Sequence, residues 1–169
     1  FHGIQLWVNL PKSKKWATPK YQDIRSKNLE LISSSDGGSL IRIIAGGLDK
    51  NISGPGATMT PINFFHLTVN PHSTVKLNWP QNFNALGYAL SGKGFVGQQR
   101  EAIFPSEACL FGKGDSLIIN GSNNDVEAEK LEFLLLGGLT INEPVAWYGP
   151  FVMNSENELK QAFDEYHKG

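Results

Sequence analysis

Residues 86–120 read LGYALSGKGFVGQQREAIFPSEACLFGKGDSLIIN. Short apolar runs alternate in this stretch with glycine-containing turns such as Ser91–Gly94 and Gly112–Asp115. Apolar segments of about four to eight residues, recurring at close spacing between turn residues, are typical of an antiparallel sandwich or barrel. The stretch therefore predicts an all-β fold, with strands at Leu86–Leu90, Phe95–Val96, Ala102–Phe104, Ala108–Phe111 and Ser116–Ile119.

Further apolar segments on both sides of this stretch have the same character. Leu29–Ile32 and Leu40–Ala45 flank a turn and predict a hairpin. Strands are also expected at Phe64–Val69, at Val75–Trp79 and, fully buried, at Leu131–Leu136. The segment from Leu139 to Trp147 contains Pro144, which predicts an edge strand or an extended segment.

The two ends of the chain differ from the middle. Gly3–Pro11 predicts a strand that is apolar on both faces, so its neighbour is expected to lie outside this chain. Lys12–Lys27 is a basic connector, either a solvated linker or a docking patch for an acidic partner. Near the other end, Ser155 and Glu158 form a capping box for a helix that we expect to pack across the barrel. The apolar residues of that helix are Leu159, Ala162, Phe163 and Tyr166. Its charged face is expected to be solvated and consists of Glu156, Glu158, Lys160, Asp164 and Glu165.

Composition excludes several classes of function. The chain has 169 residues and a net charge of −1, with a pI near 6.5. These values predict no direct contact with nucleic acid and no binding to an anionic membrane surface. No apolar stretch reaches the length of a membrane span. Cys109 is the only cysteine, so an internal disulfide is excluded and an intracellular, reducing location is expected.

Candidate catalytic and binding motifs are weak. Gly92–Gly97 matches the glycine spacing of a dinucleotide fingerprint, but β-like residues follow where a helix is required, so a hairpin turn is the expected structure. The histidines are scattered, and no His-x-His pair occurs; they are His2, His66, His72 and His167. Cys109 lies in an apolar run and is expected to be a buried small hydrophobe rather than an activated thiolate. We therefore predict no catalytic, cofactor or metal residue in this chain.

Several motifs resemble the pirin family, in order and at matching distances along nearly the whole chain. Pirins are bicupins, which consist of two β-barrels of the cupin type. The resemblance implies that residues 1–28 are an inter-domain strand and linker, and that residues 29–169 are the C-terminal cupin barrel, or jelly roll, with a terminal helix. Because the chain begins with Phe1, we expect it to be part of a longer protein whose N-terminal cupin domain is missing here. The matching motifs are Gly3–Pro11, Pro19-x-Tyr21-Gln22, Arg42–Gly46, Thr60-Pro61, Gly114–Ser116 and Tyr148–Asn154.

The resemblance also implies where metal chemistry would lie. In this family three His and one Glu hold iron in the N-terminal barrel, so none of these ligands can be assigned to this chain. Metal-binding cupins carry His-x-His and Glu ahead of a glycine like Gly92, and a further His after a turn like Gly121. Here those regions read KLNWPQNFN (76–84) and SNND (122–125), which lack histidine. The barrel of this chain is therefore expected to be metal-free.

Two functions remain open. Some pirins are quercetin 2,3-dioxygenases, which implies that this chain is the non-catalytic half of an iron-dependent enzyme. The mammalian protein is a nuclear iron protein that modulates transcription factors, which implies instead a non-enzymatic transcription co-regulator, cytoplasmic or nuclear. In both cases the first partner is the protein's own N-terminal cupin domain, and a transcription factor is a further expected partner. Trp7 is expected to dock the two halves, since an aromatic of this size buries about 150–250 Å².

Overall fold

The computed structural model describes residues 3–48, 51–123 and 129–168. Its contacts divide the chain into two compact units. The two ends of the chain, Phe1–Lys20 and Ile141–Gly169, form one unit, here called the terminal unit. Tyr21–Thr140 forms the other, here called the barrel unit. The predicted division of the whole protein into domains, with its boundary at residues 28 and 29, stays a prediction.

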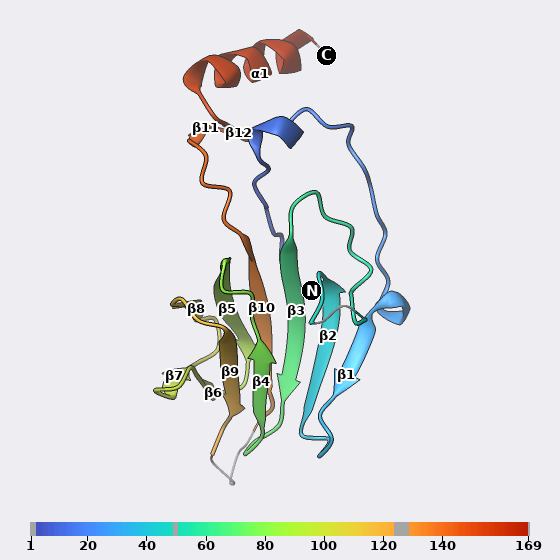
Figure 1. Ribbon diagram of the computed structural model, residues 1–169, viewed down its shortest axis with the longest axis vertical. Coiled ribbons are helices and arrows are strands. Elements are labelled where there is room, and N and C mark those ends of the chain that lie inside the picture. Colours follow the sequence, from blue (N-terminus) through green and yellow to red (C-terminus); the bar gives the residue numbers. More distant parts are fainter. Residues whose placement is uncertain (1–2, 49–50, 124–128, 169) are drawn as a thin grey trace. The chain divides into compact units, whose positions relative to one another are not determined.

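The barrel unit consists of two antiparallel sheets (Figure 1). The larger sheet has the strand order β1-β2-β3-β10-β5-β8, and the smaller has the order β4-β9-β6-β7. This arrangement confirms the predicted all-β, cupin-type fold. The strands are β1 (Glu30–Ser33), β2 (Ser39–Ala45), β3 (Ile62–Val69), β4 (Thr74–Asn78), β5 (Phe83–Ser91), β6 (Gly94–Val96), β7 (Glu101–Ile103), β8 (Ala108–Phe111), β9 (Ser116–Gly121) and β10 (Leu131–Leu139). A 3-10 turn, η2 (Ser26–Asn28), precedes β1.

The core lies between the two sheets and follows from the two-residue period of the strands. In β3, Phe65 and Leu67 are fully buried, whereas the intervening His66 is only half-buried. In the adjacent β10, Phe133 and Leu135 face the same core. The sequence predicted these strands as short apolar runs bounded by turn residues.

The glycine-rich segment Gly92–Gly97 contains a corner at one end and a hairpin turn at the other. Gly92 and Lys93 connect β5 to β6, which belong to different sheets. Gly97 begins the turn between β6 and β7, which form an antiparallel hairpin, so the predicted hairpin turn is confirmed there. Gly92 has φ +71°, and a Cβ there would lie 2.2 Å from the carbonyl oxygen of Lys130. A Cβ on Gly94 would lie 2.3 Å from the carbonyl oxygen of Asn120. The glycines are therefore required where the chain crosses from one sheet to the other, and no helix follows them.

The terminal unit contains a 3-10 turn, η1 (Lys12–Lys14), a small hairpin of β11 (Ala146–Tyr148) and β12 (Phe151–Met153), and the helix α1 (Glu156–Lys168). The strand predicted at Gly3–Pro11 is wrong for this chain, because none of residues 3–11 pairs with a strand among the described residues. An apolar alternation becomes a strand only when another backbone supplies the hydrogen bonds. Pro144 lies in an irregular segment before β11, as its lack of a backbone N–H predicted.

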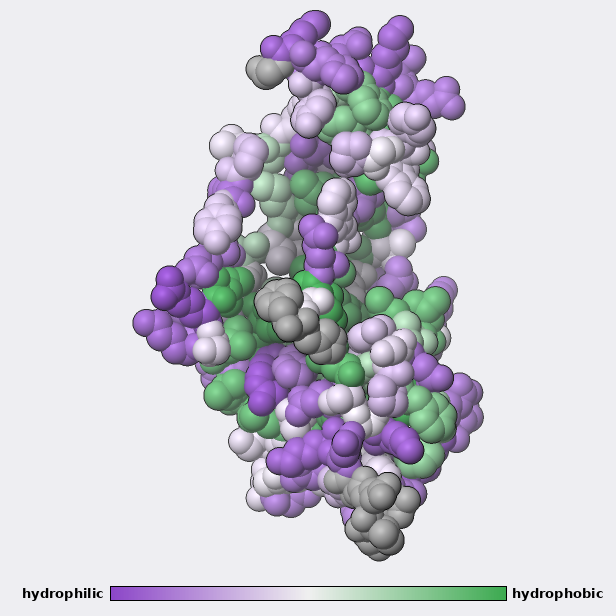
Figure 2. Space-filling view, turned by 180° about the vertical axis from the view of Figure 1, so that it is seen from behind, coloured by the Kyte–Doolittle hydropathy of each residue, from purple (hydrophilic) through white to green (hydrophobic). Residues whose placement is uncertain are grey.

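The C-terminal helix forms where the sequence predicted it, and its first turn is capped. The Glu158 N–H donates to Ser155 Oγ at 3.3 Å, and Glu158 Oε2 accepts from the Asn154 N–H at 3.0 Å. Figure 2 shows hydrophilic surface over α1, at the top of that view, as expected for its charged face. Among the described residues no helix is long and apolar enough to cross a membrane.

The packing partner of α1 differs from the one expected. Its apolar face lies on the β11–β12 hairpin, where the ring of Phe163 meets Phe151 with 4.8 Å between centroids and Tyr148 with 5.7 Å. Contacts group the helix with the terminal unit and not with the barrel unit. The helical period identified the apolar face, but a period alone does not say which surface covers that face.

Candidate functional site

The first candidate site is the interior of the barrel, where a metal-binding cupin would carry its first ligands. Residues 76–84 span the end of β4, a turn and the start of β5. Leu77 and Trp79 point into the core, and Trp79 is only 5% exposed. Lys76, on the opposite face of β4, is exposed. The inward positions of this segment are therefore occupied by apolar side chains.

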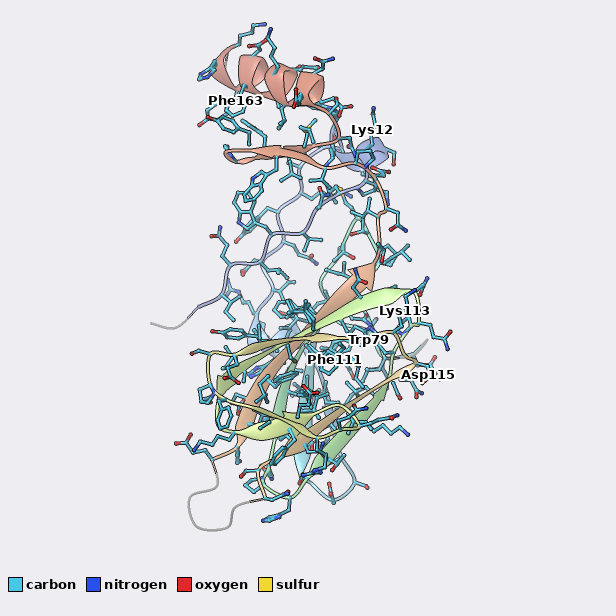
Figure 3. The ribbon with its side chains drawn as sticks, turned by 90° about the vertical axis from the view of Figure 1, so that its left-hand side faces the viewer. Lys12, Trp79, Phe111, Lys113, Asp115 and Phe163 are labelled. Carbon is cyan, nitrogen blue, oxygen red and sulfur yellow. The ribbon has the colours of Figure 1, made fainter. Side chains whose placement is uncertain are left out.

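Trp79 fills this part of the interior (Figure 3). Its indole meets Phe65 edge-on with 6.1 Å between centroids, and Phe83 edge-on with 6.4 Å. Gly137 lies against the indole, since a Cβ there would be 2.6 Å from Trp79 Cζ2. The backbone N–H of Trp79 donates to the Asp115 carbonyl at 2.8 Å, which anchors the end of β4 to the turn before β9.

The second cupin motif region begins at the end of β9. Asn120 is buried, and its Oδ1 accepts from Thr74 Oγ1 at 2.8 Å and from an Arg100 guanidinium nitrogen at 3.1 Å. The same guanidinium lies over the Phe95 ring, 4.8 Å from its centroid. The side chain of Asn120 therefore connects β9 to β4 and to the loop that carries Arg100. Its oxygen already accepts two hydrogen bonds and is not free to bind a metal. Of the four residues of this motif region, Asn124 and Asp125 lie outside the described residues.

The side chains present do not fit an iron ion. Among the described residues no three His, Cys, Asp or Glu side chains come close enough to hold a metal. Two buried side-chain atoms at inward positions, Trp79 Nε1 and Ser39 Oγ, have no hydrogen-bond partner within the described chain. An indole N–H only donates hydrogen bonds, so it offers no lone pair to a cation.

The histidines do not converge either. His66 lies on the outer face of β3, and His72 lies in the turn between β3 and β4 with φ 62°. His167 lies on α1, with its ring against Tyr166. His2 lies outside the described residues. The structure therefore brings none of these residues into a metal-binding group among the residues it describes.

A second candidate site, not predicted from the sequence, is a polar cluster on the outer face of the larger sheet. His66 Nε2 lies 2.7 Å from Glu132 Oε2, and the same oxygen accepts from Thr68 Oγ1 at 2.9 Å. Arg42 donates to Thr68 Oγ1 at 2.8 Å. The ring nitrogen of His66 is buried, and the carboxylate lies off the direction of an aligned hydrogen bond. The contact is therefore a close polar approach rather than a well-aligned bond.

Burial and the neighbouring charges shift the pKa of His66 in opposite directions. Burial lowers the pKa of His66 below its usual value, and the Arg42 charge lowers it further, while Glu132 acts in the opposite direction. Burial is the largest of these effects, so the imidazole is neutral at pH 7. The cluster depends on strand register, because β10 places Glu132 opposite Thr68 and Leu134 opposite His66. The polar cluster could therefore have been identified only by knowing that β3 pairs with β10.

An apolar row runs beside the cluster on the same face of the sheet. Direct cross-strand neighbours form it, with Phe64 opposite Leu136, Leu136 opposite Leu86, and Leu86 opposite Leu110. The row ends at Leu110 on the edge strand β8, which is 84% exposed. The face therefore combines apolar surface with one compact polar group.

Cys109 lies beside Leu110 but faces the other way, toward the core. It is half-buried, and a Cβ on Gly87 would lie 2.7 Å from its sulfur. Burial raises the pKa of the Cys109 thiol, which keeps it protonated at pH 7. Cys109 was expected to be buried and is only half-buried, and its lack of a catalytic role stays a prediction.

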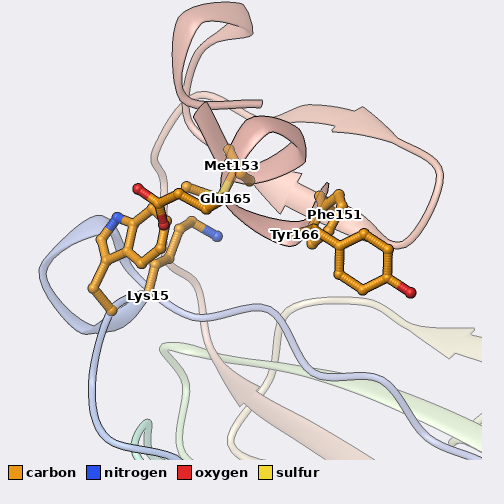
Figure 4. Close-up of a pocket in the computed structure, with 7 residues that line it drawn as sticks. Lys15, Phe151, Met153, Glu165 and Tyr166 are labelled. Atoms are coloured by element: carbon orange, nitrogen blue, oxygen red, sulfur yellow. The ribbon is translucent and has the colours of Figure 1, made fainter. Parts of the chain in front are cut away.

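The terminal unit contains a hollow of about 340 Å³ beneath α1 (Figure 4). Lys15 reaches it from the N-terminal segment, and Glu165 and Tyr166 reach it from the helix. The Lys15 ammonium donates to Asn9 Oδ1 at 2.7 Å and to the Val152 carbonyl at 2.9 Å. Lys15 therefore ties the N-terminal segment to the hairpin.

Comparisons with known proteins agree with this architecture. Residues 64–169 match the family model described as the pirin C-terminal cupin domain. The chain is 36% identical to Pirin-1 of Arabidopsis thaliana, a match that covers 98% of this chain and 56% of that protein. It is 30% identical to Pirin of Homo sapiens, over 98% of this chain and 55% of that protein. The crystal structure of a quercetin 2,3-dioxygenase from Acinetobacter baumannii is similar with a TM-score of 0.84 at 30% identity, and the match covers 96% of this chain and 54% of that one. The chain thus spans slightly more than half the length of these relatives.

Proposed function

The chain belongs to the pirin family and carries that family's C-terminal cupin domain, and from this premise we propose that it is the metal-free half of a two-barrel, iron-dependent protein. In this proposal the N-terminal half of the full-length protein holds iron through three His and one Glu, and the iron supplies the oxidation chemistry there. The present chain contributes a rigid barrel and a surface for that half.

The observation that supports this proposal is the aromatic filling of the barrel interior. Trp79, Phe65 and Phe83 pack together where a metal-binding cupin needs space and ligands. Aromatic packing of this kind stabilises the barrel through burial and fills the space around Trp79 that a metal ion and its ligands would need. Chemistry of the full-length protein is therefore assigned to its other half.

The reaction proposed for the full-length protein is dioxygenation of quercetin or a related flavonol. The similarity to the Acinetobacter baumannii quercetin 2,3-dioxygenase covers almost the entire chain and supports this choice. The alternative is a pirin-like transcription co-regulator without enzymatic activity. No residue of the described chain favours the co-regulator, so it is retained as the alternative outcome of the assay below.

Partners and location follow from the same proposal. The first partner is the protein's own N-terminal cupin domain, and a transcription factor would be a further partner if the co-regulator function holds. Direct binding to nucleic acid or to a membrane is not proposed, because the net charge of −1 does not favour a polyanionic partner. The proposed location is intracellular, in the cytoplasm or, in a eukaryote, in the nucleus.

Activity assays of two proteins test the proposed function. Full-length protein loaded with Fe²⁺ and the isolated chain treated in the same way are incubated with quercetin under oxygen, and quercetin loss is followed by absorbance. We expect turnover by the full-length protein, its loss after treatment with a chelator, and no turnover by the isolated chain. Iron bound by a full-length protein that leaves quercetin unchanged would favour the co-regulator.

A further inference from the structure

A hollow, here called the barrel hollow, lies between the edges of the two sheets of the barrel unit. β1 is an edge strand of the larger sheet and β4 is an edge strand of the smaller one, and the two strands do not pair with each other (Figure 1). The space has a volume of about 250 Å³. All of the aliphatic side chains that line it belong to the core or pack against it, so the hollow is an apolar space that reaches into the barrel. They are Ile32, Ile41, Leu48, Val75 and Leu77.

One buried hydroxyl that lines this apolar space has no hydrogen-bond partner. Ser39 begins β2, where it shares the inward face with Ile41, and it is only 6% exposed. Its Oγ has no partner among the described residues. A buried hydroxyl without a partner destabilises the folded chain, because it has given up its hydrogen bonds to water. A ligand that bonded to Ser39 Oγ would restore the lost interaction.

Two neighbouring hydroxyls that line the barrel hollow already have partners. Ser34 Oγ accepts from the Ser39 N–H at 2.9 Å and donates to the Asp36 carboxylate. Thr74 Oγ1 donates to Asn120 Oδ1 at 2.8 Å. A buried water typically makes about three hydrogen bonds to the protein, so a water on Ser39 Oγ would be poorly satisfied among these side chains. A ligand with an apolar body and one polar group suits the hollow better.

The volume and the charge of the barrel hollow define the class of ligand. An apolar cavity of about 150 Å³ holds benzene, so about 250 Å³ gives room for about ten non-hydrogen atoms. Lys76 is the one charged residue among those that line the hollow, and it lies on the outward face of β4. An ionised ligand group at the depth of Ser39 would lack a counter-charge, which makes its burial costly. The ligand that fits is therefore neutral.

We propose that the barrel hollow binds a small, neutral, largely apolar compound whose hydroxyl or carbonyl group forms a hydrogen bond with Ser39 Oγ. A serine hydroxyl both donates and accepts, so either group can be its partner. Trp79, which follows β4 and fills the interior there, is not among the residues that line the hollow. The site requires no metal, and it is separate from the iron chemistry assigned to the other half of the full-length protein.

Methyl NMR with two probes of similar shape tests for the site. Full-length protein and the 169-residue chain, both labelled at the isoleucine δ1 methyl groups, are titrated with p-cresol and with toluene. The signals of Ile32 and Ile41 should shift with both probes in both proteins. The signal of Ile103, which lies on β7 at the far edge of the smaller sheet, should stay unchanged. Unshifted Ile32 and Ile41 signals in the full-length protein would overturn the inference, even if the isolated chain bound both probes, because the other half would then cover the hollow.

Ser39→Ala separates the hydroxyl from the apolar space around it. In the full-length variant the dissociation constant for p-cresol should rise about three- to tenfold, as expected for the loss of one neutral hydrogen bond, whereas that for toluene should stay the same. Ser91→Ala is the matched control, because Ser91 is exposed at the end of β5, and it should change neither constant. Equal weakening of both probes by Ser39→Ala, or weakening of neither, would contradict the role of the hydroxyl.

Thermal unfolding of the ligand-free proteins gives an independent measurement. Because Ser39 Oγ is buried without a partner, Ser39→Ala should leave the Tm of the full-length protein unchanged or raise it. A serine that bonded within the folded chain would instead lose stability on this substitution. A lower Tm in Ser39→Ala than in Ser91→Ala would therefore show that the hydroxyl is already satisfied and would overturn the inference.

Discussion

The Trp79 indole meets the Phe65 ring edge-on, with 6.1 Å between the ring centroids and 84° between the ring planes. This contact lies in the barrel interior, between a residue of β3 and the residue that follows β4. The contact fills the interior at the end of β4 with aromatic side chains, which stabilise the barrel by burial. Among the described residues no group of three His, Cys, Asp or Glu side chains lies close enough to hold a metal.

Replacing Trp79 with Ala should destabilise the isolated chain strongly. The change removes two aromatic contacts and leaves a cavity, which typically costs about 3–5 kcal/mol for a buried Trp or Phe. Chemical denaturation measures the loss in the free energy of unfolding. Trp16→Ala is the control, because Trp16 is exposed, and it should change the same quantity by about 0.5 kcal/mol or less. Similar losses in the two variants would contradict the role assigned to Trp79.

Gly137 should tolerate no side chain. A Cβ at this position would lie 2.0 Å from the Asn84 carbonyl oxygen and 2.6 Å from Trp79 Cζ2. Gly137→Ala therefore forces β5 and the indole apart, and we expect a loss of about 1–3 kcal/mol or more in the free energy of unfolding. A Cβ on Gly112 has nothing within 4 Å, so thermal unfolding of Gly112→Ala should match that of the parent chain. An unchanged Tm for Gly137→Ala would show that the indole does not pack as described.

The polar cluster on the outer face should make stability depend on pH. The pKa of His66 is lower in the folded chain than its ordinary value of 6.5. Below pH 6.5 the unfolded chain therefore takes up the proton first, and the free energy of unfolding falls as the pH drops through this range. Above pH 6.5 His66 is neutral in both states and contributes no dependence. Urea denaturation at pH values from 5 to 8 measures the effect, which we expect to be reduced in His66→Gln.

Glu132→Gln provides the opposite test of this cluster. Removing the carboxylate removes the interaction that raises the pKa of His66, so burial and Arg42 then lower that pKa further. The loss of stability below pH 6.5 should become larger than in the parent chain. A pH dependence that is the same in the parent chain, His66→Gln and Glu132→Gln would show that His66 does not titrate differently in the folded state.

The polar contacts of the terminal unit should depend on Asn154. Its Nδ2 donates to Glu143 Oε2 at 3.0 Å and to the Pro144 carbonyl at 2.9 Å. Asn154→Ala removes both bonds, and each typical hydrogen bond contributes about 0.5–1.5 kcal/mol. Hydrogen exchange should become faster in residues 9–15 and 143–154 and stay unchanged in β3 and β10.

Gln161→Ala is the matched control for Asn154→Ala. Gln161 donates to Glu165 Oε1 at 2.8 Å on the exposed face of α1. Its removal should leave the exchange of residues 9–15 unchanged. Faster exchange in this variant, or unaltered exchange in Asn154→Ala, would mean that other contacts hold the two ends of the chain together.

The strands of the barrel could be predicted because each carries its own signal. The short apolar runs and the turn residues between them are local features that need no knowledge of the partner strand. Pairing between distant segments is not local, and the polar cluster was missed for that reason. His66 and Glu132 meet only because β10 lies beside β3 in one particular register.

The predictions at the ends of the chain were wrong for a related physical reason. The apolar pattern of Gly3–Pro11 predicted a strand, but a strand needs a partner that the described residues do not supply. The period of α1 identified its apolar face, and within the terminal unit that face packs on the β11–β12 hairpin, which the period alone could not predict. The glycine spacing at Gly92 predicted a turn. It could not predict that the strands on the two sides of this turn belong to different sheets.

The most direct test of the central claim is the iron content of the isolated 169-residue chain and of the full-length protein, measured by elemental analysis after loading with Fe²⁺ and desalting. We expect iron in the full-length protein and none above background in the isolated chain, because Trp79 and its aromatic neighbours leave the barrel without ligands. Stoichiometric iron in the isolated chain that is lost in His66→Ala or His72→Ala would contradict the account and place a metal site in this half.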